Sequence, residues 1–286
     1  AAAAGALAAM GLAGCAPTPA AEGGTKTAET GAAAPSWRDK PEMPTEFVET
    51  VDADIVVVGA GNGGLVAATT AAQNGAKVVV LEKAGAIAAA REAIGALNSK
   101  LAPDHQEDVP TLLNHASQTQ AGDANMLMYK TWAEKSGEMI EWMADTLGPK
   151  GMLFPFEWHC PDDPHAYYPA MCYNPCIGEY NPDGPNYNSY AHLEVMRDVF
   201  TEDLGGEIRF ECPAQQLVID ESGRVTGVVA EGKEGFIQVN AAKGVIICTG
   251  GYGANNEMLA DLAPGNSAWC ALRDSVTETG DGIRMA

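Results

Sequence analysis

The sequence predicts an α/β fold, in which helices flank a parallel sheet and a small antiparallel meander lies beside it. The first observation is a strand–helix–strand unit, with apolar runs at 53–58 and 77–81 around an Ala-rich segment at 65–74. The second is a third apolar run at 242–248, and the third is a hairpin pattern just before that run. Short continuous apolar runs separated by a helix are typical of parallel strands that are buried on both faces.

The strand–helix–strand unit carries a glycine motif. After the first strand the sequence is GAGNGG, so Gly59, Gly61 and Gly64 satisfy the pattern G-x-G-x-x-G. Gly75 follows the helix, where a positive φ costs glycine little, and Glu82 ends the second strand. In such a unit the glycines permit a tight turn, helix amides bind a pyrophosphate, and the acid accepts hydrogen bonds from a ribose. The spacing predicts a dinucleotide site. An ordinary glycine-rich turn is the alternative, and the motif alone does not choose between FAD and NAD.

The middle of the chain supplies the remaining elements. Apolar residues at helical spacing predict a helix over 123–147, and Leu193, Met196 and Phe200 mark another. The segment 151–190 is rich in Pro and Tyr, and we expect a long irregular loop there. The strands expected in this part are 207–212, 216–220, 225–231 and 236–240.

Composition limits the classes of function. Of the 286 residues 46% are hydrophobic and 19% are charged, which is enough apolar material for a buried core. The 38 acidic and 17 basic residues give a formal charge of −21. Phosphate backbones repel such a chain, so no nucleic-acid partner is expected.

The first residues have a composition of their own. Residues 1–14 contain only Ala, Gly, Leu and Met, and their last three, Leu-Ala-Gly, precede Cys15 in a sequence that resembles a bacterial lipobox. We therefore expect 1–15 to be a truncated lipoprotein signal peptide with Cys15 as the lipidation site, and a chance Cys in an Ala-rich tail is the alternative. A lipidated Cys15 predicts an exported protein that is anchored to the outer face of the cytoplasmic membrane. We expect 16–47 to be a flexible linker and 48–286 to be the folded domain.

Four motifs together resemble a known family. Glu82-Lys83 follows the second strand, the hairpin contains GRVTGV at 223–228, TGGYGAN stands at 249–255, and TGDG stands at 279–282. In this order they resemble the flavoprotein family of fumarate reductase and succinate dehydrogenase, in particular its exported single-chain fumarate and urocanate reductases. The resemblance implies a Rossmann-like FAD-binding domain and FAD as the cofactor.

The resemblance also implies a role for each matching residue on the nucleotide side. Glu82 would bind the adenosine ribose with Lys83 beside it, and Ala214 would lie near the adenine through its backbone. Thr249 and Gly250 would line the nucleotide side of the site. Four residues of the glycine loop would cradle the pyrophosphate: Gly59, Ala60, Gly61 and Gly64.

At the flavin end the sequence departs from the family. Asp281 is implied to approach the flavin. The family usually has Gly-Gly-Asn or Gly-Gly-Ser against the isoalloxazine ring, whereas the segment 88–98 has the sequence AAAREAIGALN. Gly95 and Asn98 are the residues that would preserve part of this contact.

The same resemblance implies an activity and partners. Such enzymes reduce an activated C=C bond of a small organic acid, such as a fumarate-like acceptor, by hydride transfer from the flavin. A cytochrome or a membrane quinol-linked protein is the expected electron donor. In the family the substrate-capping domain and its catalytic side chains follow the TGDG motif, so we expect an incomplete domain without this cap, and we name no catalytic residue. The alternatives are a non-catalytic flavin carrier, a split enzyme that needs a partner, and an NAD(P)-linked dehydrogenase.

The cysteines and histidines leave further alternatives open. With Cys15 lipidated, six Cys remain at wide spacings, which does not indicate a dense disulfide framework. Cys160, Cys172 and Cys176, with His159, are candidates for a zinc site, an iron–sulfur cluster or a disulfide. Their spacing matches no closed metal motif, so we expect ordinary thiols and no metal site. The five His are scattered, and none has a sequence partner that places it as a base.

Overall fold

The computed structural model describes residues 36–39, 41–87, 93–119, 125–159, 170–178, 191–265 and 277–286. The chain divides into two compact units, Ala1–Pro35 and Ser36–Ala286, and all described residues belong to the second. Cys15, Cys160 and the segment 88–92 therefore lie outside the described residues. The second unit begins inside the segment that we expected to be a linker.

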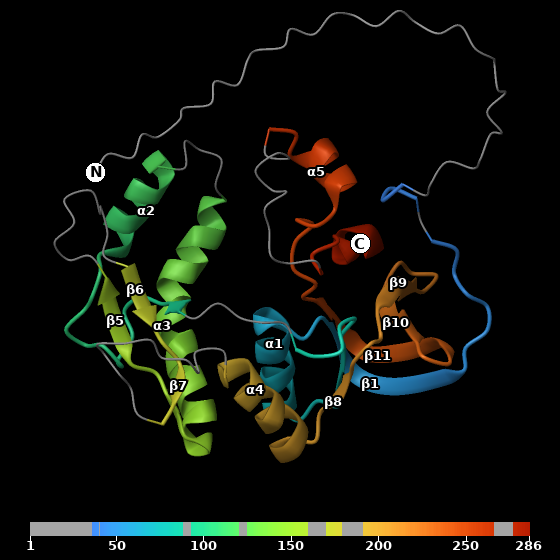
Figure 1. The fold of residues 1–286 in the computed structure, drawn as a ribbon, viewed down its shortest axis with the longest axis horizontal. Helices are drawn as coiled ribbons and strands as arrows, with labels where there is room; N and C mark the ends of the chain where they lie inside the picture. Colours follow the sequence, from blue (N-terminus) through green and yellow to red (C-terminus); the bar gives the residue numbers. More distant parts are fainter. Residues whose placement is uncertain are drawn as a thin grey trace, which may run out of the picture. The chain divides into compact units, whose positions relative to one another are not determined.

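A six-stranded sheet carries the fold (Figure 1). Its strand order is β8-β2-β1-β11-β10-β9. β8, β2, β1 and β11 pair in parallel, whereas β11, β10 and β9 pair antiparallel. The predicted α/β class is confirmed, and the parallel strands and the meander form one sheet. The strands are β1 (Glu49–Val58), β2 (Val78–Leu81), β8 (Glu207–Arg209), β9 (Ala214–Ile219), β10 (Val225–Gly232) and β11 (Gly235–Ile247).

β11 joins two segments that we predicted as separate strands. The runs 236–240 and 242–248 form one strand of 13 residues that pairs with β10 in its first half and with β1 along its length. Where the runs meet, the register shifts and Gly244 has φ +157°, so a bulge replaces the predicted break. The prediction that the second run is buried is wrong, because the described elements leave this end half covered. Ile246 and Ile247 are 36% and 38% exposed.

The last three residues of β1 and all of β2 are buried on both faces, as their apolar runs predict. Val57 and Val80 pack with residues of α1, α3 and α4, whereas Val56 and Val79 pack with residues of the meander. This division follows from the alternation of side chains along a strand. The helical segments are α1 (Asn62–Gln73), α2 (Val109–Thr119), α3 (Met126–Leu147), η1 (Gly148–Lys150), α4 (Ala191–Asp198), η2 (Val199–Asp203), α5 (Asn256–Leu262) and α7 (Asp281–Met285). In the part of the chain that the structure describes, no helix combines the length and the hydrophobicity that a membrane span requires.

Part of the segment predicted as an irregular loop forms short strands. β6 pairs with β3 and β5, and β4 pairs with β7. The loop prediction is wrong here because strands of two to four residues are too short to leave a periodic signal. Tyr173 of β6 belongs to the core: it is 1% exposed, and its ring meets that of Phe156 edge-on at 5.3 Å. Cys172 and Cys176 are buried in β6 and β7, and burial raises the pKa of the Cys176 thiol. The strands are β3 (Ile94–Gly95), β4 (Met152–Leu153), β5 (Phe156–His159), β6 (Ala170–Tyr173) and β7 (Cys176–Ile177).

Candidate dinucleotide-binding site

The residues singled out on the nucleotide side meet at one edge of the sheet. Gly59 and Glu82 follow directly after β1 and β2, and Thr249 is the second residue after β11. These strands are parallel neighbours, so their carboxyl ends lie side by side. Ligands of open α/β sheets bind at this edge.

The turn between β1 and α1 has two positions that fit glycine alone. Gly59 has φ +102°, and a Cβ there would lie 2.3 Å from the backbone oxygen of Cys248. A Cβ on Gly64 would lie 1.8 Å from the backbone oxygen of Gly59. The glycines therefore let β1, α1 and the loop after β11 approach one another closely. Ala60 is fully buried between Gly59 and Gly61, the N-cap of α1.

The amino end of α1 is open to a ligand. Gly61, the N-cap, has no side chain that could accept from the first amides of α1, and the first turn of this helix contains no acidic residue. The first helical bond runs from the Leu65 amide to the Gly61 oxygen at 2.9 Å, so helix geometry leaves the amides of Asn62, Gly63 and Gly64 without partners within the helix. Asn62 and Gly63 are exposed. Such an end, with its helix dipole, favours an anion.

Glu82 is a buried carboxylate that the backbone holds. It is 7% exposed, its Oε2 accepts from the Ala60 amide at 2.7 Å, and its Oε1 accepts from the Ala84 amide at 2.8 Å. A carboxylate has about four acceptor positions, so lone pairs remain for other donors. Glu82 is therefore fixed beside the glycine turn and can accept hydrogen bonds from a ligand.

Lys83 brings Asp281 to the same side. The Lys83 Nζ donates to Thr279 Oγ1 and to Asp281 Oδ2, each at 2.7 Å, and Thr279 Oγ1 donates to Asp281 Oδ1 at 2.9 Å. Both charged side chains are about one quarter exposed. Asp281 thus lies against the neighbour of Glu82.

The loop that follows β11 lies beside the glycine turn. The Cys248 amide donates to the Val58 oxygen at 2.8 Å, and Gly250 has φ +70°. A Cβ on Gly282 would lie 2.3 Å from Thr249 Oγ1, so Thr249 packs tightly on the start of α7. Burial raises the pKa of the Cys248 thiol, so this group is neutral beside the anion-binding turn.

Ala214 lies on the Glu82 side. It begins β9, and two residues earlier the Cys212 amide donates to the Glu82 oxygen at 2.9 Å. Ala214 and Met285 of α7 pack against the same core cluster. The structure therefore groups Ala214 with Glu82, Lys83 and Asp281.

The contacts of Gly95 and Asn98 lie in another part of the fold. Gly95 pairs with Cys172 of β6, and its oxygen accepts from the Trp132 indole at 3.2 Å. The Asn98 side chain bonds both backbone groups of Glu107, at 2.7 and 3.0 Å. These bonds explain how Asn98 holds φ +54°, a conformation that Asn adopts more readily than most residues.

Three residues of the site were not singled out from the sequence. Thr279 joins Lys83 to Asp281, and His192 Nε2 lies 3.0 Å from Asn62 Oδ1 at the start of α1. Asn62 lies within the glycine motif, which was its only signal. Thr279 lies within the TGDG motif, whereas His192 reaches the site through the tertiary fold and has no signal in local spacing.

The described residues fit a dinucleotide. The glycine turn leaves no room for a Cβ at Gly59 or Gly64, the helix end lacks a side-chain cap, and Glu82 keeps free lone pairs. A phosphate group needs the first two features and a ribose needs the third. In the described part of the chain, His, Cys, Asp and Glu do not gather in groups of three that could hold a metal ion.

Comparison with known proteins identifies this dinucleotide as FAD. The family described as "FAD binding domain" matches residues 54–286. A digoxin reductase of Eggerthella lenta is 29% identical over 96% of this chain and 50% of its own length. A urocanate reductase of the same species is 29% identical over 87% of this chain and 40% of its own length. The open conformation of a flavocytochrome c3 fumarate reductase matches with a TM-score of 0.64 at 22% identity, over 88% of this chain and 44% of that chain.

The chain spans half or less of the length of these relatives. The glycine turn after β1, Glu82 and the Lys83–Asp281 pair together form what we call the cradle. The family match covers all of these residues. Fold, cradle and family match agree, and the chain belongs to the FAD binding domain family of flavoprotein oxidoreductases, with FAD as its cofactor.

Proposed function

We propose that this chain is the FAD-holding part of a flavoprotein reductase that reduces an activated C=C bond of a small, fumarate-like acid. The observation that carries the proposal is the cradle at the carboxyl ends of β1, β2 and β11, in a chain whose relatives include a urocanate reductase. The sequence motifs at 223–228, 249–255 and 279–282 support the same reading.

The chain's part in this reaction is to hold and orient the cofactor. When bound, FAD supplies the hydride chemistry. Glu82 accepts hydrogen bonds from the adenosine ribose, and the open amides of α1 bind the pyrophosphate. Lys83, held by Thr279 and Asp281, adds a partly shielded positive charge next to Glu82. Backbone groups thus bind an anionic cofactor in a chain whose formal charge is −21.

The first experiment asks whether the chain binds FAD. The purified chain is titrated with FAD and, separately, with NADH, and binding is followed by flavin and nicotinamide fluorescence. We expect one FAD per chain and no saturable binding of NADH. A chain that binds NADH in place of FAD would support the NAD(P)-linked dehydrogenase instead.

The second experiment asks about the acceptor. The FAD-loaded parent enzyme, of which this chain is proposed to be the FAD-holding part, is mixed with a reduced viologen dye and with fumarate or urocanate, and succinate serves as the saturated control. We expect the dye to be oxidised with an unsaturated acid and not with succinate. If the bound flavin is reduced and reoxidised by dyes while neither acid is consumed, the flavin carrier or the split enzyme is the better description.

We also propose that the protein is exported and lipidated at Cys15, which lies outside the described residues. The Leu-Ala-Gly-Cys sequence and the apolar run before it support this. Expression of the gene in a bacterium with a radiolabelled fatty acid should label the wild type and not C15S. Equal labelling of the two would contradict the proposal.

A further inference from the structure

A buried histidine is bonded to an exposed residue of the glycine motif. His192 of α4 is 0% exposed, and its Nε2 lies 3.0 Å from Oδ1 of Asn62, the first residue of α1. The two residues are 130 positions apart in the chain. Asn62 itself is exposed at the open end of the helix. The bond therefore links the interior of the fold to the surface where the cofactor's phosphates bind.

The chemistry of the two groups fixes the orientation of the Asn62 amide. A carboxamide oxygen only accepts hydrogen bonds, so the Nε2 of His192 carries the proton and donates. An exposed Asn otherwise rotates its amide freely, because its terminal torsion is broad. With Oδ1 held by His192, the Nδ2 group with its two N–H donors is directed away from the imidazole. No described residue accepts a hydrogen bond from this group.

The free donors of Asn62 stand where backbone donors already favour an anion. Asn62 lies between Gly61 and Gly63, within the G-x-G-x-x-G turn, and its own amide is one of those without a partner in the helix. We propose that the Asn62 side chain donates a hydrogen bond to the pyrophosphate of bound FAD, and that His192 is the positioning residue that aims it. This inference rests on the proposed function, because it takes FAD as the ligand.

The competing explanation is that the bond merely joins α1 to α4. The two explanations differ in whether loss of Asn62 changes the affinity for ligands as well as the thermal stability. A joint alone predicts that loss of Asn62 lowers the thermal stability of the ligand-free chain and leaves its affinity for FAD and for ADP unchanged. A phosphate donor predicts, in addition, that loss of Asn62 lowers affinity for FAD and for ADP, which shares the pyrophosphate.

The decisive variant is N62A in the full chain, with N74A as the matched control. Asn74 is the same residue type at the opposite end of α1, exposed and bonded to Thr70 of its own helix. We expect N62A to raise the Kd for FAD and for ADP by about tenfold, as loss of a hydrogen bond to a charged group does. N62D should bind more weakly still, because its carboxylate faces the phosphates. N74A should bind both ligands as the wild type does. Binding is measured well below the Tm of ligand-free N62A, which we expect to be lower because the Nε2–H of buried His192 loses its acceptor.

The role of His192 is tested by rescue and by a double mutant. H192Q keeps an N–H donor and should retain most of the affinity, whereas H192A should weaken binding as much as N62A does. The double variant H192A/N62A should bind no more weakly than N62A, since both changes remove the same interaction. If the buried His192 cannot be replaced without unfolding, N62A, N62D and N74A still decide the question.

Two results would overturn the inference. A wild-type chain that binds FAD, with N62A binding it equally well, removes Asn62 from the cofactor site and leaves the proposed function intact. A wild-type chain that binds no FAD removes the proposed function and the inference together.

Discussion

Two neighbouring threonines of α1 have different surroundings. Thr69 is 0% exposed, and its hydroxyl has no hydrogen-bond partner in the described structure, whereas Thr70 is exposed. A buried hydroxyl without a partner costs about 1–3 kcal/mol, and valine has the same shape without the hydroxyl. We expect T69V to raise the free energy of unfolding in urea by about 1 kcal/mol and T70V to change it by less than about 0.5 kcal/mol. A destabilised T69V would mean that this hydroxyl is bonded in solution.

Two neighbouring glycines test the cradle in the same way. A Cβ on Gly64 would overlap the backbone oxygen of Gly59, whereas a Cβ on Gly63 would meet only the Cys248 Sγ, at an ordinary 3.8 Å. G64A must push α1 away from β1, so we expect its Kd for FAD to rise by at least about tenfold. G63A should stay close to the wild type in both Kd and Tm. Equal binding by G64A and G63A would show that the cradle is not the FAD site.

At the residue scale the sequence predicted what local spacing dictates. The glycines and Glu82 belong to one 30-residue unit whose geometry the motif fixes. Asn62 held by His192, and Lys83 held by Thr279 and Asp281, depend on elements more than a hundred residues away. No period or spacing in a single sequence contains such contacts.

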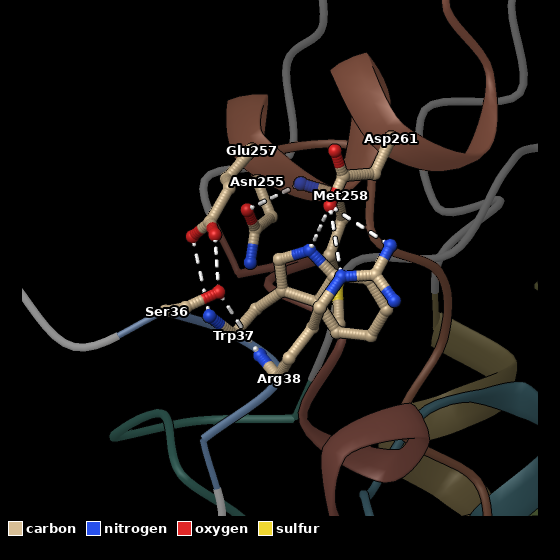
Figure 2. Close-up of polar contacts among 7 residues, drawn as sticks. All are labelled: Ser36, Trp37, Arg38, Asn255, Glu257, Met258 and Asp261. Atoms are coloured by element: carbon tan, nitrogen blue, oxygen red, sulfur yellow. Dashed lines mark hydrogen bonds and ion pairs between the residues drawn. The ribbon is translucent and has the colours of Figure 1, made fainter.

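At the scale of elements, three residues before β1 form a strap on α5 (Figure 2). The Trp37 indole donates to Asp261 Oδ2 at 2.9 Å, and the Arg38 guanidinium, stacked 4.4 Å from the Trp37 ring, donates to the same oxygen at 3.1 and 3.2 Å. Ser36 Oγ and the Trp37 amide donate to Glu257. The strap thus fastens the start of the folded unit to a helix near the cofactor side.

α5 is tied in turn to the Lys83 cluster. Asn255 caps the helix by accepting from the Met258 amide at 3.0 Å, and its Nδ2 donates to the Thr279 oxygen at 3.1 Å. A Cβ on Gly280 would lie 2.2 Å from the Met258 sulfur, so helix and loop are in close contact. Loosening the strap should therefore loosen α5 first.

We expect D261N to speed hydrogen exchange of the α5 amides, because the strap loses its charged acceptor. The control is D145N, which changes an exposed carboxylate of α3 that has no partner among the described residues. The Trp37 indole and then Arg38 hold the pKa of Asp261 below its ordinary value. A lowered pKa gives a stabilisation that is present above the ordinary value, about 3.9, and is lost as the pH falls below it. The difference between wild type and D261N should therefore shrink below about pH 4.

Element predictions succeeded where a segment is long and periodic. α3 covers the described part of the predicted 123–147 helix, and Leu193, Met196 and Phe200 are buried as expected. The predictions failed at β11, where the residues around the bulge at Gly244 interrupt the apolar pattern, so that one strand was predicted as two. They also failed in 151–190, where pairing between short strands decides the structure. The local pattern is ambiguous in both places, and the partner strands resolve it.

At the scale of the whole molecule, charge sets the response of FAD binding to salt. The chain has a formal charge of −21 and FAD is an anion, so the two repel each other at a distance. Added salt screens this repulsion, while the amides at the α1 terminus act at short range. We expect the Kd for FAD to fall roughly twofold or more between 10 and 200 mM NaCl, measured by fluorescence titration. A Kd that rises with salt would mean that a basic surface steers the cofactor.

The α/β class was predictable because alternating apolar runs and helices allow few packings. The placement of β3, β5 and β6 was not, because it depends on contacts between segments that are far apart in the chain. Ser36, the first residue of the compact unit, lies inside the expected linker for a similar reason. Its segment is short and polar, and the contact that places it is a hydrogen bond to Glu257 of α5, far away in the chain.

The pairing of β1 with β11 also sets an order of folding. Asp52 and Asn240, bonded at 2.8 Å in these strands, are 188 residues apart. A ribosome that adds about 5–20 residues per second needs roughly 10–40 s to make this span. During that time one edge of β1 has unpaired N–H and C=O groups, whereas β10 and β11 can pair as soon as both emerge. We expect pulsed hydrogen exchange during refolding to protect β10 and β11 before β1. Because Gly59 is packed by Cys248, which follows β11, the nascent chain acquires a place for FAD only after β11 and Cys248 have been made.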